Sequence, residues 1–150
     1  MRLDYIYVGI QFLLFACLLW LPHDQIFVAP VAIQILGLVI CILGSALTIY
    51  GGVTLGSSLT ALPSPKTGAN LKTDGAYRFA RHPIYTGILL AFLGYLLFSG
   101  DLAVLIVGSG LFLLFYLKVR YEERRLLQHY GQAYAEYMKT VGRFTPRQKR

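Results

Sequence analysis

Long runs of apolar residues without charge dominate the pattern along this chain. They cover residues 5–21, 28–55, 84–98 and 102–119, and the only Asp, Glu, Lys or Arg within them is Lys118. A helix of about 20 residues crosses a bilayer, and uncharged runs of this kind partition into lipid rather than water. The pattern therefore predicts an all-α membrane protein with about four transmembrane helices, a loop over 56–83 and a tail over 120–150.

The composition supports this interpretation. Hydrophobic residues make up 56% of the 150 positions and charged residues only 14%, against about 25% charged residues in soluble domains. Such a chain is not disordered, and its length suits one domain over residues 1–150. Its two cysteines are too few for a disulfide framework.

The basic residues predict the orientation. All 14 Lys and Arg residues lie before the first run, in the 56–83 loop, or from Lys118 onward, and the connections at 22–27 and 99–101 have none. The positive-inside rule then places both termini, the loop and the tail in the cytoplasm. Topology and contact with membrane lipids account for the net charge of +7, so we expect no nucleic-acid partner.

Glycines recur at a spacing of seven in the second and third runs, at Gly37, Gly44 and Gly51 and at Gly87 and Gly94. Seven residues make nearly two helical turns, so each set forms a stripe along which helix backbones could approach closely. The alternative is that glycine is simply frequent in membrane helices, and the sequence favours neither.

Candidate chemistry begins at the end of the 56–83 loop. Pro83 suits the first turn of the third helix, which places His82 near its N-cap. The free N–H groups there, with Arg78 and Arg81, could bind a carboxylate or phosphate. Headgroup anchoring explains the two arginines equally well, and Tyr85 could be an interfacial aromatic residue.

The tail offers acidic and aromatic candidates. Glu122 and Glu123 could form i,i+3 pairs with arginines on a surface helix, or one of them could face inward beside a membrane pocket. Beyond a break at Gly131, tyrosines including Tyr134 repeat at helical spacing, which an amphipathic helix lying on the membrane would explain. Arg143 could hold an anion or contact a headgroup.

Isolated polar residues suggest less. Gln11 and Gln34, inside predicted spans, are expected to bond a neighbouring helix. His82, His129 and the Glu doublet lack the short spacings of a dedicated site, so we expect no metal.

Three motifs together resemble a known family. Residues 81–87 read R-H-P-I-Y-T-G and resemble the R-H-P-x-Y-x-G signature of isoprenylcysteine carboxyl methyltransferase-like membrane proteins. Residues 122–146 resemble its second signature, with E-E-x-x-L, Y-G-x-x-Y-x-x-Y and V-x-R-x-x-P in that order. Residues 75–78 read G-A-Y-R, where the family usually has G-P-Y-R. The resemblance covers residues 71–146, about half of the chain.

The resemblance implies methyl transfer from S-adenosylmethionine to a lipid-like or isoprenoid acceptor, through oxygen or nitrogen. The cofactor would come from the cytosol and the acceptor from the bilayer. The residues that the resemblance assigns to cofactor binding are Arg81, His82, Tyr85, Glu122, Glu123 and Tyr134, and those nearest the reacting groups are Glu136 and Arg143.

Two alternatives remain open at this point. Sterol reductases share a similar R-H-P-x-Y-x-G element, which would make the protein an NADPH-dependent membrane reductase. A non-catalytic membrane subunit, with the glycine stripes as partner interfaces, also fits the composition.

Overall fold

The computed structural model describes residues 2–66 and 68–146 and is entirely helical apart from turns and one isolated bridge. The predicted all-α membrane fold is confirmed. The elements are α1 (Arg2–Trp20), α2 (Val31–Leu55), the short 3-10 helices η1 (Gly56–Ser58) and η2 (Gly75–Arg78), α3 (Pro83–Ser99), α4 (Leu102–Tyr130) and α5 (Gln132–Thr140). The basic residues Arg147, Lys149 and Arg150 lie outside the described residues.

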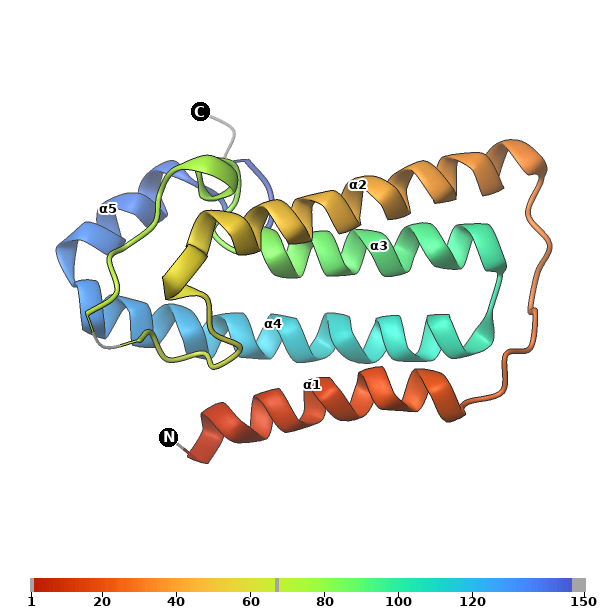
Figure 1. Ribbon diagram of the computed structural model, residues 1–150, viewed down its shortest axis with the longest axis horizontal. Helices are drawn as coiled ribbons and strands as arrows, with labels where there is room; N and C mark the ends of the chain where they lie inside the picture. Colours follow the sequence, from red (N-terminus) through yellow and green to blue (C-terminus); the bar gives the residue numbers. More distant parts are fainter. Residues whose placement is uncertain (1, 67, 147–150) are drawn as a thin grey trace.

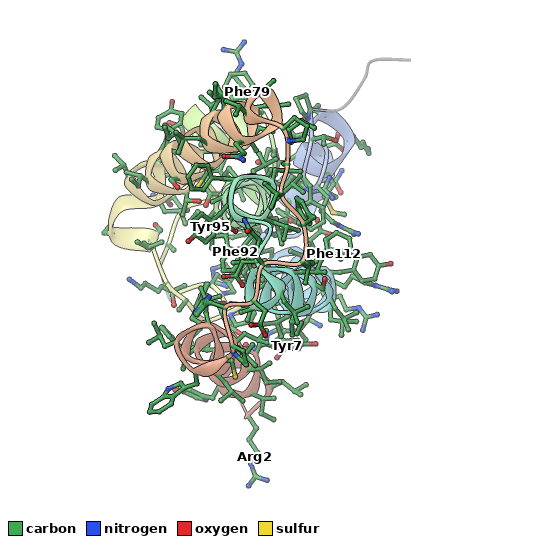
Figure 2. The ribbon with its side chains drawn as sticks, turned by 90° about the vertical axis from the view of Figure 1, so that its right-hand side faces the viewer. Arg2, Tyr7, Phe79, Phe92, Tyr95 and Phe112 are labelled. Atoms are coloured by element: carbon green, nitrogen blue, oxygen red, sulfur yellow. The ribbon has the colours of Figure 1, made fainter. Side chains whose placement is uncertain are left out.

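The four long helices form a single row in the order α2, α3, α4, α1 (Figure 1). The view turned by 90° shows the same row end-on (Figure 2). Three of these helices, α1, α2 and α4, are long and apolar enough to cross a membrane, and α3 is a shorter apolar helix of 17 residues. Most large apolar side chains of α1 and α2 are exposed, as expected of a layer that faces lipid on both sides.

The glycine stripes are the contact surface between α2 and α3. A Cβ atom on Gly44 would lie 2.6 Å from the carbonyl oxygen of Gly87, and one on Gly37 would lie 2.6 Å from that of Gly94. Distances this short leave no room for any side chain, so the two backbones touch. The stripes therefore serve packing within the chain, which decides between the two interpretations of the sequence pattern.

The other helix contacts are made by ordinary apolar packing. Val107, Leu111 and Phe115 of α4 are fully buried and form a core with side chains of α1 and α3. At one end of the row, Asp101 caps α4 by accepting hydrogen bonds from the backbone N–H groups of residues 103 and 104. Asp101 Oδ2 also lies 2.6 Å from His23 Nδ1, which ties the two connections at this end together.

The opposite end of the row carries the loop after α2, the start of α3 and the end of α4, with α5 packed against them (Figure 1). Gly131, with a φ of 54°, turns the chain from α4 into α5, as the predicted break requires. Tyr134 and Tyr137 of α5 are buried against Leu71, Leu126 and other residues of the protein. The prediction that this tyrosine stripe lies on the membrane is therefore wrong, because its apolar face is covered by the loop and by α4.

Candidate active site

The three motif segments meet at this end because the backbone of the tail pairs with the start of α3. The N–H of Arg81 donates to the carbonyl oxygen of Gly142, and the N–H of His82 donates to that of Arg143. One helical turn into α3, the Thr86 hydroxyl donates to the carbonyl oxygen of Phe144. His82 is the N-cap of α3 and Pro83 its first residue, as predicted. These bonds hold the R-H-P segment and the V-G-R segment side by side.

Glu123 is the charged centre of this junction. Its Oε1 accepts hydrogen bonds from Nε (3.0 Å) and Nη2 (2.7 Å) of Arg81, and its Oε2 accepts from Nε (3.0 Å) and Nη2 (2.5 Å) of Arg143. The Glu123 side chain is 6% exposed, that of Arg81 8%, and that of Arg143 36%. One carboxylate thus links the start of α3, α4 and the tail, and each of its oxygens accepts two charge-assisted hydrogen bonds from one arginine.

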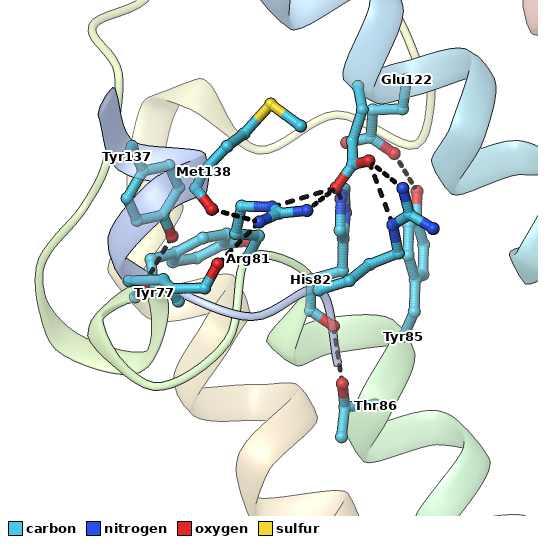
Figure 3. A network of polar contacts seen from close by, with 11 residues as sticks. Tyr77, Arg81, His82, Tyr85, Thr86, Glu122, Tyr137 and Met138 are labelled. Carbon is cyan, nitrogen blue, oxygen red and sulfur yellow. Dashed lines mark hydrogen bonds and ion pairs between the residues drawn. The ribbon is translucent and has the colours of Figure 1, made fainter. Parts of the chain in front are cut away.

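The remaining donors of Arg81 hold α5. Its Nη1 donates to the carbonyl oxygens of Met138 (3.2 Å) and Val141 (2.6 Å), at the end of that helix (Figure 3). A cation suits these carbonyl groups because they carry the negative end of the helix dipole. Arg81 is therefore bound to protein groups through all three guanidinium nitrogens.

A cavity of about 430 Å³ lies beside this junction, between the loop after α2 and helices α1, α3, α4 and α5. Its wall includes His82 and Tyr134, and two of their polar atoms, His82 Nε2 and the Tyr134 hydroxyl, are buried without a hydrogen-bond partner in the described residues. His82 Nε2 lies 3.4 Å from Glu123 Oε1, close enough for an ion pair but not aligned as a hydrogen bond. Buried polar atoms are normally satisfied, so these two atoms point to a ligand.

Aromatic and acidic side chains complete the wall of the cavity. The Tyr85 hydroxyl donates to Glu122 Oε2 over 2.9 Å, and the Tyr85 ring stacks on His82 with 5.7 Å between ring centroids (Figure 3). Burial raises the pKa of Tyr77, Tyr134 and Tyr137 well above the ordinary tyrosine value. These hydroxyls therefore remain protonated donors at neutral pH.

Glu136, expected near the reacting groups, lies apart from the cavity wall on the exposed face of α5. Its carboxylate accepts hydrogen bonds from Gln132 and Lys139, and its side chain is 55% exposed. Arg143 is at the junction but does not line the cavity. The other residues assigned from the resemblance, apart from Glu123 at the junction, all contribute to the cavity wall.

The Glu doublet makes none of the i,i+3 pairs that a surface helix would predict. Glu123 is bound to Arg81 and Arg143, and Glu122 to Tyr85, so both adjacent carboxylates turn toward the protein. Arg125 instead donates to the hydroxyl of Ser64 in the loop. Among residues 2–66 and 68–146, no group of three or more His, Cys, Asp or Glu side chains could hold a metal ion.

The cavity wall also includes residues that the sequence did not assign to a site, and Lys118 and Gln11 are two of them. Lys118 ends an apolar run in the sequence, yet it is 1% exposed and lines the cavity. Gln11 of α1 lines the cavity as well and accepts a hydrogen bond from Lys118, which confirms the expected contact with a neighbouring helix. Gln34 instead bonds the carbonyl oxygen of Ala29, just before its own helix. For Lys118, the available signal in the sequence was its position as the single charged residue within an apolar run.

Comparison with known proteins places this arrangement in a family. The sequence model of the phospholipid methyltransferase family matches residues 32–133. Protein-S-isoprenylcysteine O-methyltransferase B of Arabidopsis thaliana is 31% identical over 108 residues, which cover 70% of this chain and 55% of that protein. Methanethiol S-methyltransferase of Pseudomonas deceptionensis is 29% identical, over 59% of this chain and 33% of that protein.

A solved structure has the same fold. The eukaryotic intramembrane Ras methyltransferase, an isoprenylcysteine carboxyl methyltransferase, matches with a TM-score of 0.68 and 29% identity, over 76% of this chain and 42% of that one. The chain thus spans about half the length of the isoprenylcysteine relatives that it matches. The resemblance found in the motifs is confirmed. This protein is an integral, multi-pass membrane protein and belongs to the phospholipid methyltransferase family of membrane methyltransferases.

Proposed function

We propose that this protein transfers a methyl group from S-adenosylmethionine to a lipid-like acceptor that enters its site from the bilayer. The observation that carries the proposal is the cavity whose wall holds two buried polar atoms without an aligned hydrogen bond among the described residues, His82 Nε2 and the Tyr134 hydroxyl. Both residues belong to the motifs by which the chain resembles its family.

The cavity suits S-adenosylmethionine in size and in chemistry. Its volume of about 430 Å³ falls in the range of cofactor sites. The wall offers hydroxyl and imidazole groups for the ribose and adenine, the rings of Tyr85 and Tyr130 for stacking or for the sulfonium, and the carboxylate of Glu122. When bound, this cofactor supplies an electrophilic methyl group, and transfer to an acceptor releases a neutral thioether.

The residues around Glu123 would make the cavity rigid rather than perform chemistry. In-line displacement needs a short, aligned approach in a site that excludes water. Arg81 and Glu123 join α3, α4 and α5 through buried charged hydrogen bonds, which fixes the walls relative to one another. The Tyr130 hydroxyl donates to the carbonyl oxygen of Ala69, and the Tyr137 hydroxyl donates to that of Tyr77. These hydrogen bonds hold the loop against α4 and α5.

For the acceptor we propose a carboxylate on an apolar molecule. Arg143 binds Glu123 through Nε and Nη2, and its side chain is 36% exposed, so part of the guanidinium remains available to an anion. The exposed Tyr116, Leu117 and Leu127 of α4 toward this end would let an apolar tail remain in lipid. Glu136 has no role in this proposal, because it is exposed and paired with Lys139.

We further propose that the site faces the cytoplasm. The described Lys and Arg residues lie in segments at or toward the end of the row that carries the cavity, and the connections at the other end, residues 22–27 and 99–101, have none. The positive-inside rule favours the cytoplasm for the basic end, where a water-soluble cofactor is available.

Binding and turnover would test the proposal. Calorimetry on protein in lipid nanodiscs should detect S-adenosylhomocysteine at micromolar concentration, and His82→Ala should abolish binding while Glu136→Gln keeps it. Radiolabelled methyl groups should pass to a prenylated cysteine carboxylate rather than to a thiol or a phospholipid amine. Folded protein that binds NADPH but no adenosylated ligand would refute the methyltransferase proposal in favour of a reductase.

A further inference from the structure

Lys118 is a buried cation on the wall of the cavity. It is 1% exposed, and its ammonium group donates to Gln11 Oε1 over 2.7 Å and to the carbonyl oxygen of Ala61 over 3.0 Å. Its Nζ also lies 5.2 Å from the centroid of the Tyr85 ring. Both hydrogen-bond partners are neutral, so only neutral groups, two oxygens and one aromatic ring, solvate the positive charge.

The absence of a counter-ion is the informative feature. Within residues 2–66 and 68–146, no carboxylate lies within ion-pair distance of Lys118, whereas the buried Arg81 and the partly exposed Arg143 at this end both pair with Glu123. A buried charge without an opposite charge is costly, because two neutral hydrogen bonds replace only part of its hydration. A ligand anion in the cavity would supply the missing charge.

Glu122 stands one helical turn beyond Lys118 on the same face of α4. Opposite charges at this spacing pair readily on a helix. Here Gln11 and Ala61 hold the ammonium group, while the Tyr85 hydroxyl holds Glu122 Oε2, so the two charges line the wall without pairing. The next positions at the same spacing, Leu126 and Tyr130, line the cavity as well and are apolar or aromatic.

We propose that Lys118 and Glu122 form a receptor for an α-amino acid zwitterion, and that it binds the amino-acid end of S-adenosylmethionine. Lys118 takes the carboxylate and Glu122 the ammonium group, which leaves the nucleoside toward Tyr130 and Tyr134. Gln11 of α1 is a positioning residue, because it holds the lysine at the wall without itself needing to touch the ligand. This inference rests on the proposed function and adds the direction in which the cofactor lies in the cavity.

Two ligands separate this role from general support of the fold. S-adenosylhomocysteine carries the zwitterion, and 5′-methylthioadenosine has the same nucleoside without it. In nanodisc calorimetry, Lys118→Met should weaken S-adenosylhomocysteine about 10- to 100-fold, the range for a lost charged hydrogen bond, and leave 5′-methylthioadenosine unchanged. Lys118→Arg, which keeps the charge, should retain most of the affinity. Lys139→Met removes an exposed lysine on α5 and serves as the charge-matched control.

The outcomes are distinct. Equal weakening of both ligands by Lys118→Met, or a loss in Lys118→Arg as large as in Lys118→Met, would overturn the receptor and leave a structural lysine. If Lys118→Met does not fold, Gln11→Leu decides, since it should reduce the preference for S-adenosylhomocysteine over 5′-methylthioadenosine. An unchanged preference in Gln11→Leu would overturn the proposal. Failure of the wild-type protein to bind either ligand would instead contradict the cofactor proposal itself.

Discussion

Replacing Glu123 by glutamine tests whether one carboxylate holds the cavity-bearing end of the molecule together. The substitution keeps the size of the side chain but removes its negative charge. The amide nitrogen would face a guanidinium group in place of one carboxylate oxygen, and it cannot accept hydrogen bonds. Arg81, whose side chain is 8% exposed, would then be a buried cation without a counter-ion.

The size of the effect follows from burial. Breaking a buried ion pair by removing one partner costs about 3–5 kcal/mol. Arg143 is 36% exposed, so water can replace its half of the interaction, and we place the total near the lower end, at about 3 kcal/mol. At about 2–4 °C per kcal/mol for a chain of this size, the melting temperature should fall by roughly 10 °C.

The assay is thermal unfolding of purified protein in one detergent, followed by circular dichroism. Glu136→Gln is the matched control, because it makes the same chemical change at a carboxylate that is 55% exposed and paired only with surface groups. That control should melt within about 1–2 °C of the wild-type protein. Equal melting temperatures for the two variants would refute the view that Glu123 joins α3, α4 and the tail.

Three further predictions follow from particular contacts. Gly44→Ala should lower the free energy of unfolding by about 1–3 kcal/mol, because its new Cβ would lie 2.5 Å from the backbone nitrogen of Ala91. A Cβ at Gly9 would have nothing within 4 Å, so Gly9→Ala should be neutral. Thermal unfolding of both variants would measure this. The hydrogen bond to Asp101 raises the pKa of His23. The ion pair therefore contributes its full stabilisation at pH values below the ordinary histidine pKa. This contribution is lost as the pH rises through the raised pKa of the folded state. The melting temperature of wild-type protein should therefore exceed that of His23→Gln near pH 5.5 and converge with it by about pH 8.5; a constant difference would contradict this. Tyr134→Phe should leave the melting temperature unchanged, since its hydroxyl has no partner among the described residues, yet weaken S-adenosylhomocysteine about 5- to 10-fold in calorimetry.

The sequence predicts the four membrane helices because each of them corresponds to a long run with almost no charged residues. The bounds of α3, Pro83–Ser99, lie within one residue of the predicted span. The continuation of α4 to Tyr130 and the break at Gly131 were also foreseeable. The sequence does not predict which neighbour a stripe of similar residues on a helix contacts. The glycines of α2 could have met lipid, a partner or α3, since spacing along one helix carries no information about its neighbour.

The site shows the same limit at the level of single residues. The tyrosine stripe of α5 has a period that fits a membrane surface and a protein surface alike, and tertiary packing decided for the protein. The Glu123 junction joins residues 42 and 20 positions apart in sequence, beyond the reach of any helical spacing rule. Motif resemblance brought these residues together in advance, but only the fold separates Glu136 from the others.

The backbone pairing of Arg81 and His82 with residues 142 and 143 has a consequence for biosynthesis. The segment that forms these bonds is translated after all five α-helices. A nascent chain thus possesses every apolar helix before it possesses this junction. Docking of the tail against the start of α3 is therefore a late step in the assembly of this end of the molecule.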